Sequence, residues 1–309
     1  MDDFHTKGYT KPFNIINKEE IIDFKKTFNK ILEDQKLLSP IYGICTHRDW
    51  HLHYKNLMLM VYRPQVVERL KSLLGNDLMV WRTSIFHKAP GDGALGWHQS
   101  SLFAGEEYCI FKPALLPPVG YDTYGKMFNL SCWIALDDVT IENGAMQVAE
   151  GTHNKQYPIK KVPFKDSVFG KVAYDNFKRS GDIDRLKELD SRYACETIFN
   201  PSEENIKINT IKMKAGQGYI FTDRLMHNSL ANVTLDNRRL AINFRITIPE
   251  TLVYPHRLDG DLIDGNDHNI KNHGCVMLNG KSMGVNNIFL IEHRDLLINL
   301  VNGTFNYSS

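Results

Sequence analysis

The residues most informative about chemistry are His98, His227 and Ser100. Many mononuclear iron sites bind the metal through two imidazoles and one carboxylate, which leaves three coordination positions open. Two of these ligands often lie two residues apart on a strand, where side chains i and i+2 face the same way. The residue two positions after His98 is Ser100, which is short and uncharged. The pattern therefore predicts either no such site, or an iron site with one additional open position that another ligand must fill.

A second set of residues suits a cosubstrate that carries a carboxylate. Arg239 and Arg245 lie six residues apart in an alternating segment, and an even spacing along a strand puts both guanidinium groups on one face. Arginine binds carboxylates through two parallel hydrogen bonds. We expect Trp133 to lie on a neighbouring strand, and we expect residues 218–227 to form one strand that ends in His227.

One acidic residue offers an alternative to the open position. Asp223 lies four residues before His227, an even step along the strand expected over 218–227, so its carboxylate could face the same site. The competing interpretation, which we favour, is that Asp223 faces outward or supports a ligand from behind. A carboxylate on the metal would supply the negative charge that Ser100 lacks.

The pattern of helical and extended segments predicts the scaffold. Helices are expected over residues 18–34, where Asn17 and Glu20 form a capping box, and from Pro64 to just before Gly75. Short β-branched or aromatic runs between turn residues indicate strands over 78–87, 126–136, 145–148, 206–213, 219–221 and 239–248. Many short strands of this kind predict a mainly β barrel or jelly roll with helices packed outside.

We expect a single domain over residues 1–309. It would consist of a helical annex over about 1–75, a jelly-roll core over about 76–250 and a C-terminal extension over 251–309. Residues 155–205, rich in Lys and Asp, are expected to be an insertion with one helical patch near 182–193. Together with the annex and the 103–125 loop, this insertion would build the substrate entrance.

Composition excludes several classes of partner. Lys and Arg number 37 and Asp and Glu 36, so neither nucleic acid nor an anionic membrane is an expected partner. The longest apolar runs are too short to span a bilayer, and residues 1–15 lack a signal-peptide core. The five cysteines are scattered, without a C-x-x-C pair, which indicates free thiols and a cytoplasmic location.

The cluster of His47, Asp49, His51 and His53 has spacing that resembles a metal site. It precedes the expected β core, so we interpret it as a helix or turn of the annex and not as a metal centre. His51 is expected to line the substrate entrance or to cap a helix.

Several longer strings resemble the phytanoyl-CoA dioxygenase superfamily, and within it the carrier-protein-dependent Fe(II)/2-oxoglutarate aliphatic halogenases typified by the syringomycin threonine halogenase. The strings are residues 80–86, 88–92, 97–99, 213–217 and 225–227, together with Trp133, the Asn143-Gly144 turn, Arg239 and Arg245. The similarity runs from the first expected helix to about residue 250.

The resemblance implies a double-stranded β-helix and a role for each matching residue. His98 and His227 would bind Fe(II), Arg239 would bind the distal carboxylate of 2-oxoglutarate, Trp133 would lie near this cosubstrate, and Arg245 would lie beside a halide. At the position of Ser100, hydroxylating members have Asp and the halogenases have Ala or Gly, where chloride coordinates iron. Ser84 stands where the similar halogenases have an acidic residue.

The resemblance thus implies an enzyme that uses Fe(II), 2-oxoglutarate, O2 and chloride. Its reaction would be chlorination of an unactivated aliphatic carbon in a small molecule or in an amino acid tethered to a carrier protein. One alternative is a hydroxylase of the same fold, with a water held by Ser100 or with Asp223 on the metal. Another is an iron-free binding or scaffold protein, although the presence of His98, His227 and Arg239 together argues against it.

Overall fold

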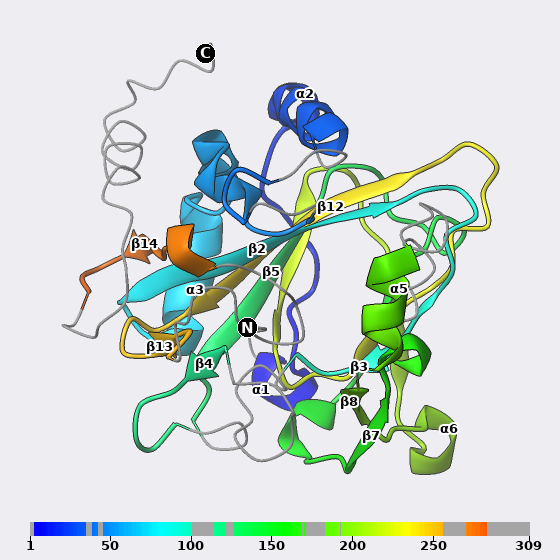
Figure 1. The fold of residues 1–309 in the computed structure, drawn as a ribbon. Helices are drawn as coiled ribbons and strands as arrows, with labels where there is room; N and C mark the ends of the chain where they lie inside the picture. The colour runs from blue at the N-terminus through cyan, green and yellow to red at the C-terminus, as the bar shows by residue number, and fades with distance from the viewer. Residues whose placement is uncertain are drawn as a thin grey trace.

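The computed structural model describes residues 3–34, 39–42, 46–100, 114–121, 126–168, 170, 183–191, 193–255 and 270–282. In this part of the chain two antiparallel sheets share an apolar interior, and helices cover the outer face of the larger sheet (Figure 1). The architecture is mainly β with few helices. It confirms the predicted jelly roll, or double-stranded β-helix, with a helical annex.

The elements of the described residues have the following bounds. The helices are α1 (Phe4–Lys7), α2 (Lys18–Asp34), α3 (Pro64–Leu74), α5 (Ile183–Asp190) and α6 (Pro201–Glu204), with 3-10 turns η1 (Trp50–Leu52), η2 (Lys55–Met60), η4 (Thr152–Asn154), η5 (Phe164–Asp166) and η6 (Ile270–Asn272). The strands are β1 (Phe13–Asn14), β2 (Leu78–Lys88), β3 (Leu95–His98), β4 (Leu115–Leu116), β5 (Asn129–Ala135), β6 (Met146–Ala149), β7 (Ile159–Pro163), β8 (Tyr193–Thr197), β9 (Ile208–Ile211), β10 (Gln217–Thr222), β11 (His227–Ser229), β12 (Arg239–Thr247), β13 (Leu252–Val253) and β14 (Val276–Asn279).

The larger sheet has six strands in the order β1-β10-β5-β12-β2-β14. Its central strands β5, β12 and β2 run side by side and are buried along most of their length (Figure 1). Side chains alternate between the two faces of a strand. In β12 the apolar Leu240, Ile242 and Phe244 therefore face the helices, while Arg239 and Arg245 face the interior between the sheets.

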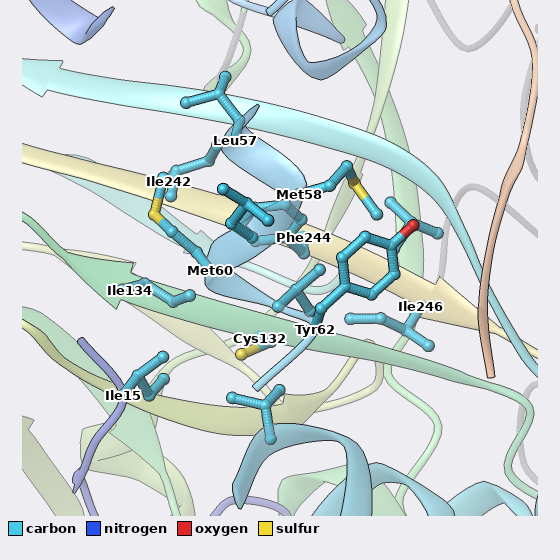
Figure 2. Packing of buried hydrophobic residues seen from close by; sticks show 14 of the residues in the cluster. Ile15, Leu57, Met58, Met60, Tyr62, Cys132, Ile134, Ile242, Phe244 and Ile246 are labelled. Carbon is cyan, nitrogen blue, oxygen red and sulfur yellow. The ribbon is translucent and has the colours of Figure 1, made fainter. Parts of the chain in front are cut away.

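Helices α2 and α3 and the turn η2 cover the outer face of this sheet. Figure 2 shows Met58 and Met60 of η2 packed near Ile242 and Phe244 of β12. These side chains are fully buried, and burying one large apolar side chain contributes about 1.5–3 kcal/mol. This packing fixes β12, and with it the arginines on the opposite face of the same strand.

The smaller sheet has four strands in the order β3-β11-β6-β9. Between the two sheets lies a second apolar cluster, to which the larger sheet contributes Trp133 and Tyr219 and the smaller sheet contributes Val148 and Ile211. The interior is thus enclosed by both sheets, and the candidate ligands His98 and His227 lie on β3 and β11 of the smaller one.

The sequence predicted three of the helices and six of the fourteen strands of the described residues. The helices over 18–34 and from Pro64 to Gly75 have the expected bounds. Five of the six expected strands coincide with β2, β5, β6, β9 and β12 to within a few residues, and the sixth lies inside β10. The helical patch near 182–193 is α5 followed by the start of β8.

Two parts of the topology differ from the expectation. β14 lies in the expected C-terminal extension but pairs with β2 in the six-stranded sheet, so the core continues beyond residue 250. The insertion over 155–205 contains the antiparallel pair β7–β8 as well as helices α5 and α6. Much of the 103–125 loop lies outside the described residues. No helix within the described ranges has the length and apolar character needed to cross a membrane.

Candidate metal centre

His98 and His227 face each other across two neighbouring strands. They are direct register partners between β3 and β11, and their ring centroids are 4.2 Å apart. Both side chains are buried, and the ring of Phe221 packs edge-on against His227 at 5.1 Å. The structure thus brings together the two histidines that lie 129 residues apart in the sequence (227 − 98).

Both imidazoles are held in the tautomer that a metal requires. Nδ1 of His98 lies 2.8 Å from the carbonyl oxygen of Gly96, and Nδ1 of His227 lies 2.8 Å from that of Leu225. A carbonyl oxygen only accepts, so in each neutral ring Nδ1 carries the proton and Nε2 carries the lone pair. Such a bond at the second nitrogen orients metal-binding histidines in general.

Electrostatics keeps both rings neutral. Burial is the main cause that lowers the pKa of His98 to about 4; the Gly96 carbonyl opposes it, and the charge of Arg245 adds to it. Burial also holds the pKa of His227 well below its usual range, and the neighbouring His98 adds to this effect. A pair of neutral, buried imidazoles with fixed tautomers fits a divalent transition metal.

The path of the chain into His227 differs from the expected single strand over 218–227. β10 ends at Thr222 in the six-stranded sheet, a turn follows, and His227 begins β11 in the four-stranded sheet. The expectation of one continuous strand was therefore wrong. The even spacing between Asp223 and His227 does not put the two side chains on one strand face.

Ser100 and Asp223 are linked by their main chains. The Ser100 N–H donates to the carbonyl oxygen of Asp223 at 2.8 Å, and Ser100 is buried. The Asp223 carboxylate accepts bonds from Asn129 Nδ2 and Thr222 Oγ1, each at 3.2 Å, and burial raises its pKa. Among the described residues no group of three or more His, Cys, Asp or Glu side chains is arranged to hold a metal ion. Asp223 therefore does not complete a three-ligand set with His98 and His227 in this structure.

Arg239 lies at the start of β12 with its guanidinium buried between the sheets. It donates to the carbonyl oxygen of Gly144 at 2.6 Å, and its central carbon lies 5.4 Å from the centroid of the Trp133 ring. Its Nε has no hydrogen-bond partner among the described residues. Burial lowers the pKa of Arg239 to about 10, so the group remains a cation at neutral pH. A buried guanidinium with an unused donor fits an incoming carboxylate.

Lys88 is a cation at this site whose role the sequence pattern did not suggest. It is the direct register partner of Arg239 across β2 and β12. Its Nζ donates to Ser229 Oγ at 2.9 Å and to the Leu230 carbonyl at 2.6 Å. Burial, assisted by the charge of Arg239, lowers the pKa of Lys88 to about 8. The strand pairing reveals its place beside Arg239, from which 151 residues separate it in the sequence (239 − 88).

Arg245 faces the same interior as Arg239, as the even spacing predicted. Its register partners are Ser131 on β5 and Arg82 on β2. Its charge contributes to the lowered pKa of both His98 and His227, which shows that it lies near the pair. The two arginines, six positions apart on β12, thus separate a distal cation from one near the histidines.

The cluster of His47, Asp49, His51 and His53 has a structural role at the edge of the larger sheet. Asp49 accepts from the main-chain N–H of Thr83 at 2.7 Å, and His51 Nδ1 lies 2.8 Å from Thr83 Oγ1. His51 is fully buried inside η1, whose caps are Asp49 and His53, so the expectation that it caps a helix was wrong, and its place at a substrate entrance stays a prediction. These contacts attach the annex to β2.

Comparison with known proteins gives a family and a set of structural neighbours. A family model described as Phytanoyl-CoA dioxygenase (PhyH) matches residues 4–240. The solved structure "CytC3 with Fe(II) and alpha-ketoglutarate" is 22% identical, with 94% of this chain and 90% of that chain covered and a TM-score of 0.65. The non-heme monooxygenase ThoJ in its apo form is 18% identical, with coverage of 98% and 99% and a TM-score of 0.60.

A third neighbour is the non-heme alpha ketoglutarate dependent epimerase SnoN from nogalamycin biosynthesis, 15% identical, with coverage of 94% and 93% and a TM-score of 0.60. No curated protein matches the sequence. At these identities the structural neighbours establish the fold alone, and their titles describe several different reactions on it.

Proposed function

The chain belongs to the phytanoyl-CoA dioxygenase family, and from this premise we propose that it is an Fe(II)- and 2-oxoglutarate-dependent halogenase that chlorinates an unactivated aliphatic carbon. The observation that carries the proposal is the buried pair of neutral imidazoles, 4.2 Å apart, with no acidic side chain of the described residues completing the group. His98 and His227 would hold the metal through Nε2. When bound, iron with 2-oxoglutarate and O2 supplies the oxidising power needed for an unactivated C–H bond.

Ser100 would leave a place for a free halide. An Asp at this position would provide one negative charge, and a chloride ion provides the same charge without a side chain. Ser100 is neutral and short, so it neither fills the place nor repels an anion there. The Asp223 carboxylate, which could have supplied that charge, is instead engaged with Asn129 and Thr222. The cation Arg245 near the histidines favours an anion in this region.

Arg239, Lys88 and Trp133 would receive the cosubstrate. The unused Nε of Arg239 and the neighbouring ammonium of Lys88 favour the distal carboxylate of 2-oxoglutarate. The Trp133 ring beside the guanidinium provides an apolar surface for the carbon chain. These residues would bind and orient the cosubstrate between the sheets, where water is largely excluded.

The resemblance to carrier-protein-dependent halogenases supports a small aliphatic substrate, either free or as an amino acid attached to a carrier protein. The mass change of candidate aminoacyl carrier proteins, incubated with Fe(II), 2-oxoglutarate, O2 and chloride, tests this proposal. A gain of chlorine minus hydrogen is the expected result.

A hydroxylase is the second candidate, and the hydroxyl of Ser100 is the observation that favours it. Halogenases of the resembling type have Ala or Gly at this position, whereas a serine hydroxyl can hold a water on the metal. In that case the product would gain oxygen, and chloride would have no effect.

Substitutions of Ser100 separate these two functions. Under anaerobic conditions, Fe(II) and 2-oxoglutarate together should give a visible charge-transfer band that chloride shifts. We expect the shift to persist in Ser100→Ala, which keeps the position open, and to disappear in Ser100→Asp, which fills it. Ser100→Ala is the matched control, because it removes the hydroxyl without adding a charge.

The outcomes lead to different conclusions. A wild-type band that chloride does not shift, together with a hydroxylated product, would favour the hydroxylase. An unchanged chloride dependence in Ser100→Asp would refute the open-position argument. Absence of any band would favour an iron-free binding protein.

A further inference from the structure

Asn243 occupies the middle of the interior face of β12, between the two arginines. It is 3% exposed. Its register partners are Ser84 on β2 and Trp133 on β5. It follows Arg239 by four residues and precedes Arg245 by two, so all three side chains point to the same side of the sheet.

The amide of Asn243 has an unused polar atom. Its Nδ2 lies 3.2 Å from Ser131 Oγ, and its Oδ1 has no hydrogen-bond partner among the described residues. The Ser131 hydroxyl can either donate or accept, so the amide can turn over and exchange the positions of its oxygen and nitrogen. In either orientation one buried polar atom of Asn243 remains unpaired. Such an atom is costly in a protein interior and points to a ligand.

The side chains between Arg239 and Asn243 on the interior face of the sheet are small and apolar. Ala241 of β12 pairs directly with Ala135 of β5 between them, and both are fully buried. The central carbon of the Arg239 guanidinium lies 5.4 Å from the centroid of the Trp133 ring, and Trp133 is the register partner of Asn243 on β5. A short chain that starts at this guanidinium can therefore run over the alanines and end at the Asn243 amide.

The charges around Asn243 select the kind of group that it meets. Guanidinium groups lie on both sides of it along β12, at Arg239 and Arg245. A cationic group such as an ammonium would be repelled at this point, whereas a carboxylate would be attracted. An anionic partner requires the amide nitrogen to face the interior, with the Ser131 hydroxyl donating to the amide oxygen.

We propose that Asn243 is a positioning residue for the keto-acid end of 2-oxoglutarate, donating from Nδ2 to its C1 carboxylate. Arg239 and Lys88 then hold one end of the five-carbon diacid, and Asn243 and Ser131 orient the other end toward the histidines. This inference rests on the proposed use of 2-oxoglutarate. It adds a second polar contact to that of Arg239 and explains the unused atom of a buried amide.

The test compares two keto acids of equal chain length by calorimetry on the Zn(II)-loaded full chain. 2-Oxoglutarate has both carboxylates, and 2-oxovalerate has only the keto-acid end. We expect Asn243→Leu to weaken both ligands by about tenfold to a hundredfold, the range for loss of one hydrogen bond to a charged group. Arg239→Gln is the matched control, and it should weaken 2-oxoglutarate while leaving 2-oxovalerate nearly unchanged.

The isosteric Asn243→Asp variant tests the sign of the contact. A carboxylate there would repel the ligand carboxylate, so both keto acids should bind more weakly than to Asn243→Leu. Under anaerobic conditions with Fe(II), the charge-transfer band of Asn243→Leu should also shift in wavelength. A purely structural role would lower stability without moving the band of the folded fraction. Asn243→Ser, which keeps a smaller donor, gives a second variant if Asn243→Leu does not fold.

Three results would overturn the inference. One is an affinity of Asn243→Leu or Asn243→Ser within about twofold of wild type, less than the loss of any single hydrogen bond. Another is tighter binding by Asn243→Asp, which would mean that the partner is a donor. The third is a loss confined to 2-oxoglutarate, which would assign Asn243 to the distal carboxylate. Failure of the wild type to bind either keto acid would instead refute the proposed function, and the inference with it.

Discussion

Replacement of Gly144 by alanine tests whether the residues packed around Gly144, whose carbonyl binds Arg239, are as close together as the structure indicates. Gly144 has a φ of +94°, a left-handed conformation that alanine adopts at a cost of about 1–2 kcal/mol. A Cβ built there would lie 2.5 Å from Lys88 Cδ and 2.8 Å from the carbonyl oxygen of Leu230. The lysine is held by its own hydrogen bonds, and the carbonyl is main chain, so neither can move without loss. Such overpacking adds about 1–3 kcal/mol.

Gly91→Ala is the matched control. Gly91 also has a left-handed φ, +83°, but a Cβ there meets no atom within 4 Å. This variant should lose only the backbone part, about 1–2 kcal/mol. Gly144→Ala should lose about 2–5 kcal/mol in total, the sum of the backbone and packing costs. The difference between the two variants isolates the contact with Lys88 and Leu230.

Urea denaturation of both variants measures the stabilities, and calorimetry measures 2-oxoglutarate affinity. The carbonyl of Gly144 accepts the hydrogen bond that positions Arg239, so Gly144→Ala should also weaken 2-oxoglutarate, and Gly91→Ala should not. Equal stability losses in the two variants would refute the packing argument. A large stability loss with unchanged 2-oxoglutarate affinity would separate Gly144 from the cosubstrate site.

Two further predictions concern the charged and metal-binding groups. The pKa of Lys88 is lowered to about 8, so its ammonium is lost as the pH rises through 8. The affinity for 2-oxoglutarate should therefore fall between about pH 7 and 9 in the wild type, but not in Lys88→Arg, whose guanidinium stays charged. The same fall in both proteins would exclude Lys88 as the cause. His98→Ala and His227→Ala should each abolish stoichiometric iron binding, measured by metal analysis. The control His87→Ala, which changes an exposed histidine, should retain the iron. Full iron content in either of the first two variants would overturn the ligand assignment.

Local signals in the sequence were sufficient to predict helices α2 and α3. In α2 the Asn17 Oδ1 accepts from the Glu20 N–H and the Glu20 carboxylate accepts from the Asn17 N–H, both at 2.9 Å, as the capping box predicted. In α3 Pro64 occupies the first turn and Gly75 follows the end. Each of these signals acts within a few residues, so no knowledge of the tertiary fold was needed.

The parts that the sequence did not predict depend on distant partners. β14 is a short strand whose place is fixed only by pairing with β2, with Val276 opposite Val80. The corner between β10 and β11 looked like one strand, because apolar residues continue through Leu225 and Met226. Those two side chains are buried in separate clusters, so the apolar pattern is kept while the chain changes sheet. Periodicity alone does not reveal such a corner.

The corner between β10 and β11 also explains why the Asp223 carboxylate lies near Ser100 without binding a metal in the place of a carboxylate at position 100. Because the chain turns at Asp223, this residue presents its carbonyl oxygen to the Ser100 N–H, and its carboxylate is bonded to Asn129 and Thr222. The main-chain bond fixes the backbone of Ser100 to that of Asp223, and the side-chain bonds keep the Asp223 carboxylate paired with Asn129 and Thr222. Both imidazoles are neutral, and among the described residues no group of three or more His, Cys, Asp or Glu side chains includes them, so the pair itself supplies no negative charge to a divalent metal. In the proposed halogenase the balancing charge would come from small anions, the cosubstrate and a halide, and this is the chemical argument on which that proposal rests.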